Sequence, residues 1–306
     1  DEALQVAKKI GYPVIVKAAA GGGGRGMRVA HNEVALRAGL RAAQQEASAA
    51  FGNGAVYIEK FLERARHVEV QVLGDKHGNS VHLYERDCSV QRRHQKLIEE
   101  APGPGIDSRK RDDVCKSAAR LIKSAGYHGA ATVEFLMDEK QNFYLLEVNT
   151  RVQVEHPVTE LITGVDIVKS MIRAAAGEPL PFRQKDIQIR GHAMECRINA
   201  EDPARNFAPS PGLITRWEPP GGPGIRVDSH VVTGYRVPTN YDSMICKLLA
   251  VADSREEAIA RMSRALREFT VEPIKTTIAL HSELMKDAGF VRGGVDIHYL
   301  ERLLKK

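Results

Sequence analysis

The strongest constraint on the fold of this chain is the strict alternation of apolar and polar residues over 67–73. Period-two alternation predicts a β-strand with one buried face. Turn-forming residues follow at 74–79 and the alternation resumes over 80–85, so we predict an antiparallel hairpin. A second hairpin is predicted from 131–137 and 143–148. Antiparallel hairpins of this kind favour an α+β fold over a regular βαβ array.

Segments with helical periodicity separate these hairpins. The sequence predicts helices over 3–10, 33–50, 112–124, 166–176 and 254–268. Clusters of proline and glycine punctuate the C-terminal third, where we expect several short strands. At 306 residues the chain is long enough for two or three separately packed parts.

A glycine-rich segment raises the question of a dinucleotide site. Gly21, Gly23 and Gly26 satisfy the pattern G-x-G-x-x-G. That pattern binds a dinucleotide only where a strand precedes it and a helix follows at once. Residues 14–16 are β-branched like a strand, but 27–30 alternate apolar and polar like a second strand. The glycines are therefore predicted to join two strands, and a dinucleotide site would require a helix to start within 24–27.

Two other interpretations of the glycine segment stay open. It is either a surface linker or a flap whose backbone amides close over phosphate groups. The flanking Lys17, Arg25 and Arg28 favour the flap, because they add positive charge beside it. A Walker-type loop is excluded, since no Gly-Lys-Ser/Thr ends the run.

Two acidic residues of the second hairpin are predicted to face each other. A four-residue loop at 139–142 would pair Asp138 with Phe143 and would set Glu134 directly across from Glu147. Like charges in that position are destabilising. Mg²⁺ prefers one or two carboxylates together with phosphate oxygens, so a metal site would explain the pair. The alternative is that both side chains face water.

Polar residues then recur at every second position from 147 to 155. They are Glu147, Asn149, Arg151, Gln153 and Glu155. A continuous strand would place all five on one face, which is either an exposed edge or a reactive surface. On a reactive surface Arg151 could bind a planar oxyanion through two hydrogen bonds, and Glu155 could accept its proton.

The run 85–96 carries a cluster of positive charge. It contains Arg86, Arg92, Arg93, His94 and Lys96. Such a run is either a solvated loop or the positive wall of a cleft for an anionic substrate, which the neighbouring glycine flap and acidic pair favour. Cys88, inside the run, is expected to be a packed thiol, because no base is placed against it.

Composition excludes several classes of function. The 44 basic and 39 acidic residues leave a net charge of only +5, without a basic tail, so no nucleic-acid partner is expected. The four cysteines form no C-x-x-C pair, as is typical of free thiols in a reducing compartment. No apolar run approaches the span of a bilayer and no leader pattern precedes the first helix, so we expect no membrane partner and a cytoplasmic location.

Several long motifs closely resemble the biotin carboxylase component of biotin-dependent carboxylases, which belongs to the ATP-grasp superfamily. The matching segments are 14–29, 59–75, 85–102, 145–160 and 191–203, in the family's order. The resemblance runs from Glu2 to about Leu304. It implies an ATP-grasp fold with a lid subdomain carrying the glycine flap at 1–62, a catalytic core at 63–190 and a biotin-carboxylase-type C-terminal subdomain at 191–306.

The resemblance also implies a reaction. In this family ATP and bicarbonate form carboxyphosphate, whose CO₂ is delivered to N1′ of biotin on a carrier. The implied cofactors are ATP, Mg²⁺ or Mn²⁺, and biotin. The implied partners are a biotin carboxyl carrier protein or domain, a carboxyltransferase component and a second copy of the chain in a homodimer. The acyl acceptor, such as acetyl-CoA in fatty acid biosynthesis, is not indicated.

Site residues are implied position by position. Nucleotide contacts are implied for Lys17, Gly23, Gly24, Glu59, Lys60, Phe61, Leu62, His67, Gln91 and His94. The metal ligands would be Glu134, Glu147 and Asn149. Bicarbonate would be bound by Lys96, Arg151, Gln153 and Val154, and Glu155 would remove its proton. Arg197 would steady the biotin enolate.

One departure from the family and two rival functions remain. Family members carry a further nucleotide-binding domain before the position of Asp1, so this chain alone is expected to bind nucleotide weakly and to turn over little or not at all. A rival enzyme is an ATP-grasp ligase with another acceptor, such as a carbamoyl-phosphate-synthesising fragment, which would not require Arg197. The other rival is a non-catalytic fragment that folds, binds nucleotide or dimerises.

Overall fold

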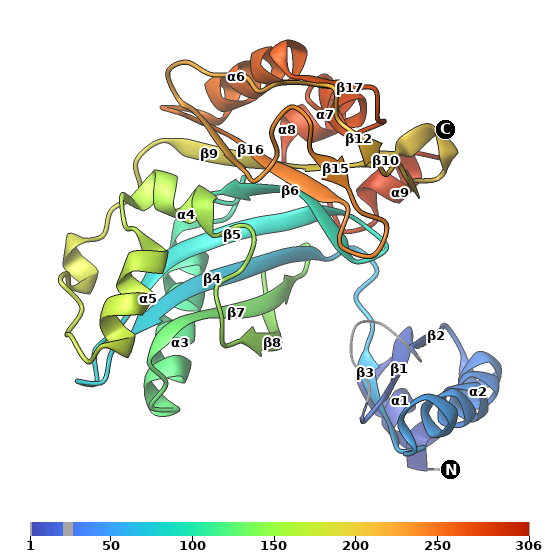
Figure 1. Ribbon diagram of the computed structural model, residues 1–306. Helices are drawn as coiled ribbons and strands as arrows, with labels where there is room; N and C mark the ends of the chain where they lie inside the picture. The colour runs from blue at the N-terminus through green and yellow to red at the C-terminus, as the bar shows by residue number, and fades with distance from the viewer. Residues whose placement is uncertain (1, 21–26, 306) are drawn as a thin grey trace. The chain divides into compact units, whose positions relative to one another are not determined.

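A computed structural model describes residues 2–20 and 27–305 of the chain (Figure 1). The chain divides into two compact units, Asp1–Ala65 and Arg66–Lys306. Each has its own hydrophobic core and is described by itself.

The first unit is a three-stranded antiparallel sheet packed against two helices. Its elements are α1 (Glu2–Ile10), β1 (Val14–Ala18), β2 (Arg28–Ala30), α2 (Glu33–Phe51) and β3 (Val56–Lys60). β1 lies in the centre and is antiparallel to both of its neighbours. The core is formed where apolar residues of both helices meet the buried face of β1.

The pairing in this unit decides how the glycine segment is connected. Ile15 of β1 pairs with Val29 of β2, so the glycines join two antiparallel strands, as predicted. The backbone N–H of Ala35 donates to Asn32 Oδ1 over 2.9 Å, and this cap starts α2 after β2. Met27 is not helical and β2 starts at Arg28, so the described residues contain none of the helix that a dinucleotide site requires after the glycines. The predicted flap residues Gly23 and Gly24 lie outside the described residues.

The second unit is built around an eight-stranded antiparallel sheet. Across the sheet the strands are β14 (Ile225–Ser229), β16 (Met244–Ala252), β9 (His192–Asn199), β6 (Gln95–Ala101), β5 (Ser80–Arg92), β4 (Arg66–Gly74), β7 (Gly129–Met137) and β8 (Phe143–Asn149). Both predicted hairpins are present, as β4–β5 and β7–β8.

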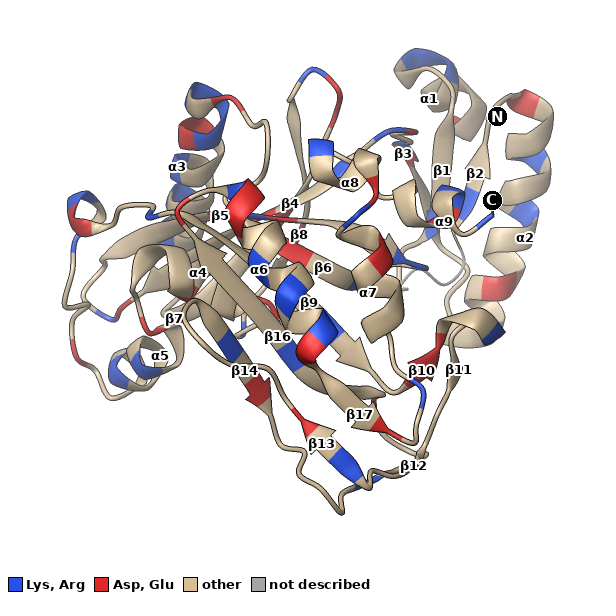
Figure 2. Cartoon of the chain, turned by 90° about the horizontal axis from the view of Figure 1, so that it is seen from above, with Lys and Arg blue, Asp and Glu red and all other residues tan. Residues whose placement is uncertain are grey.

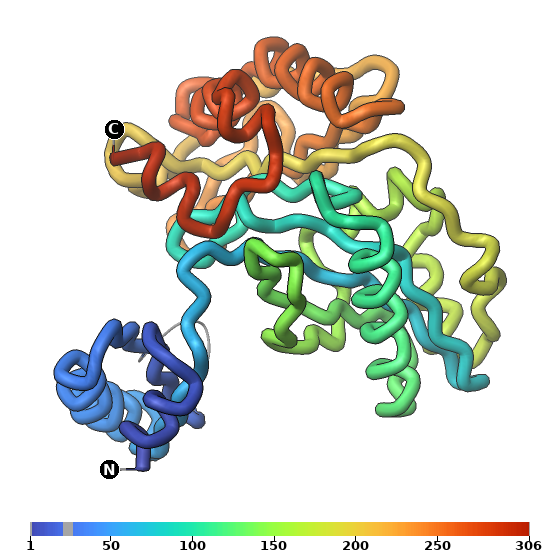
Figure 3. Tube along the Cα trace, turned by 180° about the vertical axis from the view of Figure 1, so that it is seen from behind, coloured from blue at the N-terminus to red at the C-terminus, as the bar shows by residue number. Residues whose placement is uncertain are grey.

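Helices cover the sheet of the second unit. They are α3 (Ser108–Ser124), α4 (His156–Thr163), α5 (Ile167–Ala175), α6 (Arg255–Glu268), α7 (Ile278–Leu284), α8 (Ala288–Arg292) and α9 (Tyr299–Leu303). α3 packs on β4 and β5, and Figure 3 shows it crossing these strands. α6 and α7 form the largest core with β9 and β16. α4 packs against β6, β9 and β16 through a smaller cluster.

Short elements complete this unit. They are η1 (Gln184–Asp186), β10 (Glu201–Asp202), η2 (Pro203–Arg205), β11 (Ala208–Pro209), β12 (Gly212–Leu213), β13 (Arg216–Glu218), β15 (Arg236–Val237) and β17 (Thr270–Glu272). The expectation of short strands in the C-terminal third is confirmed. Charges of both signs occur along α3 and α6, with six basic and two acidic residues in α3 and four basic and three acidic residues in α6 (Figure 2). Within 2–20 and 27–305, no helix is both long and apolar enough to cross a bilayer.

In the second hairpin Glu134 and Glu147 are paired as predicted, although the register near the turn differs from the predicted one. Met137, not Asp138, pairs with Phe143, so the predicted loop was wrong. The Asp138 side chain instead accepts the backbone N–H groups of residues 140 and 142 and closes a turn. A bulge between the pairs of Glu134 and Phe135 then shifts the register by one residue. Glu134 therefore does pair with Glu147, as predicted.

Residues 147–155 do not form one continuous strand, so their five polar residues do not share a strand face. β8 ends at Asn149, the chain turns, and α4 begins at His156, which was not predicted. Pro157 lies in the first turn of α4, where its fixed φ and missing N–H suit a helix start. The polar residues after Asn149 thus come from a turn and a helix cap rather than from one strand face.

Candidate active site

A cleft of about 370 Å³ lies in the second unit and is lined by most of the predicted site residues of that unit. The predicted residues in its wall are His67, His94, Lys96, Glu134, Glu147, Asn149, Arg151, Gln153, Val154, Glu155 and Arg197. They come from β4, β6, β7, β8, β9, and the turns at 93–94 and 150–155. Acidic and basic side chains are both present in the wall, as a site that binds a cation together with an anion requires.

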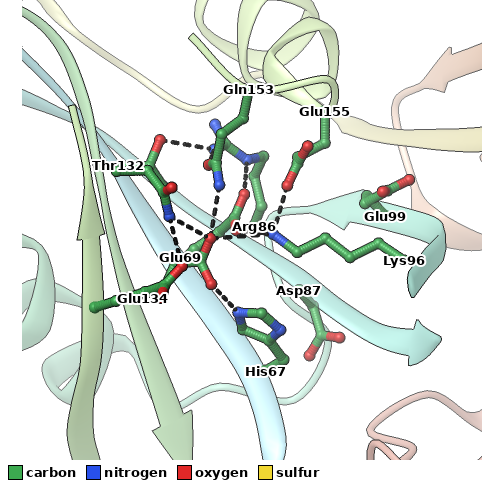
Figure 4. Close-up of polar contacts among 12 residues, drawn as sticks. His67, Glu69, Arg86, Asp87, Lys96, Glu99, Thr132, Glu134, Gln153 and Glu155 are labelled. Atoms are coloured by element: carbon green, nitrogen blue, oxygen red, sulfur yellow. Dashed lines mark hydrogen bonds and ion pairs between the residues drawn. The ribbon is translucent and has the colours of Figure 1, made fainter. Parts of the chain in front are cut away.

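Lys96 lies at the centre of this charge network. Its Nζ donates to Glu69 Oε2 and to Glu155 Oε1, each over 2.6 Å, and more weakly to Glu134 Oε1 at 3.3 Å (Figure 4). Burial by itself would lower the pKa of Lys96, but the carboxylates around it raise this pKa above its usual value. Lys96 therefore carries a fixed positive charge in the cleft.

Arg86 is part of the buried hydrogen-bond network next to the cleft. Its side chain is fully buried and its Nε donates to Glu69 Oε1 over 2.6 Å. Further hydrogen bonds reach Gln71 at 2.8 Å and Gln153 at 3.1 Å. The basic run 85–96 is thus neither a solvated loop nor a uniform wall, because β5 and β6 carry most of it and turn at 93–94. Cys88, inside the run, is buried, and this burial raises the pKa of its thiol well above the usual value.

Glu134 is held as a carboxylate by its neighbours. Burial would raise its pKa, but a 2.7 Å hydrogen bond with His67 Nε2 and the charge of Lys96 lower it to about 2. Gln153 Nε2 and Asn149 Nδ2 also donate to its Oε1, over 2.6 and 3.0 Å.

A hard cation fits the acidic pair of the hairpin. Asn149 Nδ2 also donates to Glu147 Oε1 over 3.0 Å, so one amide group bridges the two facing carboxylates. The carboxylates converge on the Asn149 amide, whose Nδ2 faces them while its Oδ1 accepts from Arg151; rotating this amide by 180° would present an oxygen beside the two carboxylates, and oxygen ligands are those that Mg²⁺ and Mn²⁺ prefer. These three side chains are therefore able to hold such an ion.

Glu155 and Arg197 form the opposite side of the cleft. Glu155 sits at the start of α4 and is almost fully buried. Its Oε2 accepts Arg197 Nη2 over 3.0 Å, and its Oε1 accepts Lys96. Two cations thus hold this carboxylate in one orientation.

Arg151 and Val154 complete the turn between β8 and α4. Arg151 is exposed and its Nη2 donates to Asn149 Oδ1 over 3.1 Å. The carbonyl of Val154 accepts Lys247 Nζ over 3.1 Å. Arg151 is accordingly the predicted bicarbonate ligand that is accessible to solvent at the cleft.

Two predicted nucleotide contacts of this unit lie in different surroundings. Gln91 is buried in β5, pairs with Lys96 and does not line the cleft. His94 does line it, from a turn in which Arg93 and His94 both have positive φ, 48° and 66°. This left-handed backbone makes a two-residue turn between β5 and β6.

The remaining predicted contacts belong to the first unit. Lys17 of β1 forms an ion pair with Glu59 of β3. Lys60 Nζ donates to the carbonyls of Gly11 and Tyr12 over 3.0 and 2.7 Å. The backbone N–H of Phe61 donates to the carbonyl of Pro13, and Leu62 follows it. These two hydrogen bonds of Lys60 stabilise the loop after α1.

Charged residues beneath the cleft were missed from the sequence. Glu69 accepts hydrogen bonds from both Arg86 and Lys96, and Glu99 accepts a 2.6 Å hydrogen bond from Arg197 Nε. The available signal was that Glu69 shares a strand face with His67, two residues away. Polar positions in an alternating strand were instead assigned to solvent, although this face is buried here.

Comparisons with known proteins identify the family. Residues 1–183 match the family model described as carbamoyl-phosphate synthase L chain, ATP binding domain. Residues 195–302 match the model of the biotin carboxylase C-terminal domain. The chain is 57% identical over 304 residues to the biotin carboxylase of Pseudomonas aeruginosa, covering 99% of this chain and 67% of that protein. This chain belongs to the biotin carboxylase family.

Solved biotin carboxylase structures have the same fold. The biotin carboxylase domain of Hydrogenobacter thermophilus 2-oxoglutarate carboxylase, in complex with MgADP, ADP and bicarbonate, has a TM-score of 0.92 and 51% identity over 98% of this chain and 66% of its own. The biotin carboxylase of Campylobacter jejuni also has a TM-score of 0.92, with 50% identity over 97% of this chain and 66% of its own. The predicted α+β, ATP-grasp fold is confirmed. The chain spans about two thirds of the length of these biotin carboxylases.

Proposed function

We propose that this chain carries the centre for ATP- and bicarbonate-dependent carboxylation of biotin through carboxyphosphate. The observation that carries the proposal is Glu155, a buried carboxylate held between the cations of Lys96 and Arg197 at the cleft. A substrate anion entering there would meet positive charge and a positioned proton acceptor together. Joining two anions requires both kinds of group, because charge must be neutralised while a proton is removed.

Bicarbonate would bind at the turn after β8. In this proposal Arg151 holds two of its oxygens in a bidentate contact, and the Gln153 amide and the Val154 backbone add orientation. Lys96 neutralises the anion, and the ionised Glu155 accepts the proton of its hydroxyl group. Burial of Gln153 and Glu155 limits the contact of water with the proton acceptor, whereas Arg151 is exposed.

The proposal also includes ligands for the metal and for the nucleotide. Glu134, Glu147 and Asn149 would hold Mg²⁺ or Mn²⁺, which when bound neutralises the phosphate oxygens of the nucleotide. The proposed nucleotide contacts are Lys17, Gly23, Gly24, Glu59, Lys60, Phe61, Leu62, His67, Gln91 and His94. We also propose the functional division into a lid at 1–62, a catalytic core at 63–190 and a C-terminal subdomain at 191–306.

Biotin and the protein partners extend the proposal. Arg197 would stabilise the biotin enolate, with biotin presented by a carrier protein or domain that also serves a carboxyltransferase. A homodimer is supported by the Hydrogenobacter thermophilus domain, whose crystal structure is that of a dimer. The four free cysteines support a reducing compartment, and we propose the cytoplasm.

Substrate dependence of ATP cleavage tests this function in the intact protein that carries the sequence. MgATP cleavage should require bicarbonate and should rise when free biotin is added. Arg151→Ala should lower bicarbonate-dependent cleavage by about a hundredfold, because it removes a bidentate contact to the anion. Cleavage stimulated by ammonia rather than biotin would favour the carbamoyl-phosphate alternative, and an Arg151→Ala variant that leaves activity unchanged would contradict the proposal.

A further inference from the structure

Two buried acids face each other beside the cleft, and the proposed chemistry does not use them. Glu99 of β6 pairs directly with Glu195 of β9, and both side chains have no exposed surface. Among the described residues, neither Glu195 carboxyl oxygen has a hydrogen-bond partner, and neither does Glu99 Oε2. Two carboxylates at directly opposed positions repel each other, and burial strengthens the repulsion.

Arg197 connects this acidic pair to the proposed active site. It lies two residues after Glu195, and therefore on the same face of β9. Its Nε and Nη2 both lie 2.6 Å from Glu99 Oε1, and its Nη2 also donates to Glu155 over 3.0 Å. Among the described residues Nη1 has no hydrogen-bond partner, and Arg197 lines the cleft. The Nε and Nη2 groups of the guanidinium are thus held by Glu99 and Glu155, while Nη1 is available to a ligand.

The backbone of Arg197 is fixed as well. Its carbonyl oxygen accepts Thr277 Oγ1 over 3.0 Å and His281 Nε2 over 2.8 Å, both from the start of the α7 region. With the backbone held, the direction of the guanidinium depends on Glu99 and Glu155.

The charges around the pair favour one proton between the two acids. The charged and titratable groups that face them are Lys96 (β6), Arg197 (β9), Lys247 (β16) and Glu155 (before α4), with Asp228 (β14) and His156 (α4) acting on Lys247. Burial and the charge of Glu99 raise the pKa of Glu195 well above its usual range, and burial raises that of Glu99 to about 7. The charge of Arg197 lowers the pKa of both acids, and that of Glu99 more strongly, because Arg197 also donates a hydrogen bond to Glu99.

We propose that Glu99 is a positioning residue that aims the Arg197 guanidinium at biotin, and that Glu195 behind it carries a proton which the two acids share. The proton prevents two facing negative charges, so that Glu99 remains available to Arg197. This inference rests on the proposed biotin carboxylation and adds a residue that acts on the biotin step through Arg197.

A comparison of two partial reactions tests the positioning role in the intact protein. Glu99→Gln should lower biotin-stimulated ATP cleavage by about tenfold or more, since a charge-assisted hydrogen bond to Arg197 is lost. Bicarbonate-dependent ATP cleavage without biotin should stay within about twofold, because Lys96 still holds Glu155 and the proposed bicarbonate ligands are unchanged. Equal losses in both reactions, or no loss in either, would overturn the positioning role.

Glu195→Gln and Glu100→Gln are the matched controls. Glutamine resembles a protonated glutamate in size and lacks its charge, so Glu195→Gln should keep both rates within about twofold. A large loss would mean that Glu195 is ionised in the native protein. Glu100 is the neighbouring buried acid of β6, held by His192 and Arg255, and its substitution controls for damage to the strand.

Two spectroscopic measurements do not depend on activity. The infrared carbonyl band of a protonated carboxylic acid should be present in the wild-type protein at pH 7 and absent in Glu195→Gln, but retained in Glu100→Gln. The Nε–H resonance of ¹⁵N-labelled Arg197 should exchange slowly with solvent and lose this protection in Glu99→Gln. Absence of the band in the wild type would refute the shared proton, and unchanged protection would refute the contact that fixes Arg197.

The two proposals fail in different ways. A wild-type protein that does not cleave ATP with bicarbonate and biotin would refute the proposed function. The infrared band and the Arg197 resonance would still decide whether Glu99 and Glu195 hold Arg197 as inferred.

Discussion

Lys96 interacts with three buried carboxylates at once. Its ammonium group lies within 3.3 Å of three carboxylates that are almost fully buried. Removing one partner of a buried charged network leaves the other charges uncompensated, which costs more than the pair contributes in isolation. The residue is therefore expected to stabilise the unit as well as to bind substrate.

Lys96→Met should lower the free energy of unfolding by about 3 kcal/mol, measured by urea denaturation at pH 7. The methionine fills similar volume, so the loss comes from the unpaired carboxylates. Lys116→Met is the control, because Lys116 pairs with Asp112 on the exposed face of α3 and should change stability little. Equal effects of the two substitutions would contradict the network.

Glu69 should make stability depend on acid pH. Burial would raise its pKa, but Arg86 and Lys96 lower it from 4.5 to about 2. The unfolded chain therefore takes up a proton before the folded chain does, and the stabilisation present above pH 4.5 is lost as the pH falls towards 2. Glu69→Gln should remove this part of the pH dependence, so the difference between variant and wild-type unfolding free energies should shrink across that window. A constant difference would show that folding does not lower the pKa of Glu69.

At the scale of helices and strands, α7 fixes the backbone beside the active site. His281 is fully buried and donates through Nε2 to the carbonyl of Arg197. Burial lowers its pKa from 6.5 to about 4. Unfolding between these values takes up a proton, so stability should fall as the pH drops from 6.5 to 4.

His281→Gln should remove this pH dependence while an amide N–H replaces the donor. Thermal unfolding measured at intervals from pH 7 to pH 4 checks the prediction, and the half-buried His298, just before α9, gives a control substitution. An unchanged pH profile in His281→Gln would mean that another group titrates in this window.

The same scale shows which elements the sequence could predict. The β4–β5 and β7–β8 hairpins were predictable because period-two alternation and turn residues are local signals. The predicted register of β7–β8 was right from Thr132 to Glu134 and wrong from Phe135 to Met137, because hydrogen bonds to the Asp138 side chain close the turn and a bulge then shifts the pairing. α4 has only eight residues and follows an alternating polar run, so a strand was the better local fit.

The buried acids show why the site could be predicted only in part. Glu99 and Glu195 occupy alternate positions in strands, where a polar residue normally indicates a solvent-facing side. Their face is instead covered by α4, an element that the sequence did not reveal. The residues lining the cleft were found through long motifs, whereas their support depends on contacts between segments far apart in the chain.

For the whole molecule, ligand binding should appear as stability that depends on metal. A ligand that binds only the folded protein stabilises it in proportion to its concentration over its dissociation constant, by about 2.7 kcal/mol at a hundredfold excess. MgATP should therefore raise the thermal midpoint of the intact protein, and excess EDTA should abolish most of that rise. The double variant Glu134→Gln, Glu147→Gln should lose the metal-dependent part, because neutral amides replace both proposed carboxylate ligands. Arg151→Ala should keep the rise while losing bicarbonate-dependent turnover, which separates nucleotide binding from chemistry; a double variant that responds to MgATP like the wild type would place the metal elsewhere.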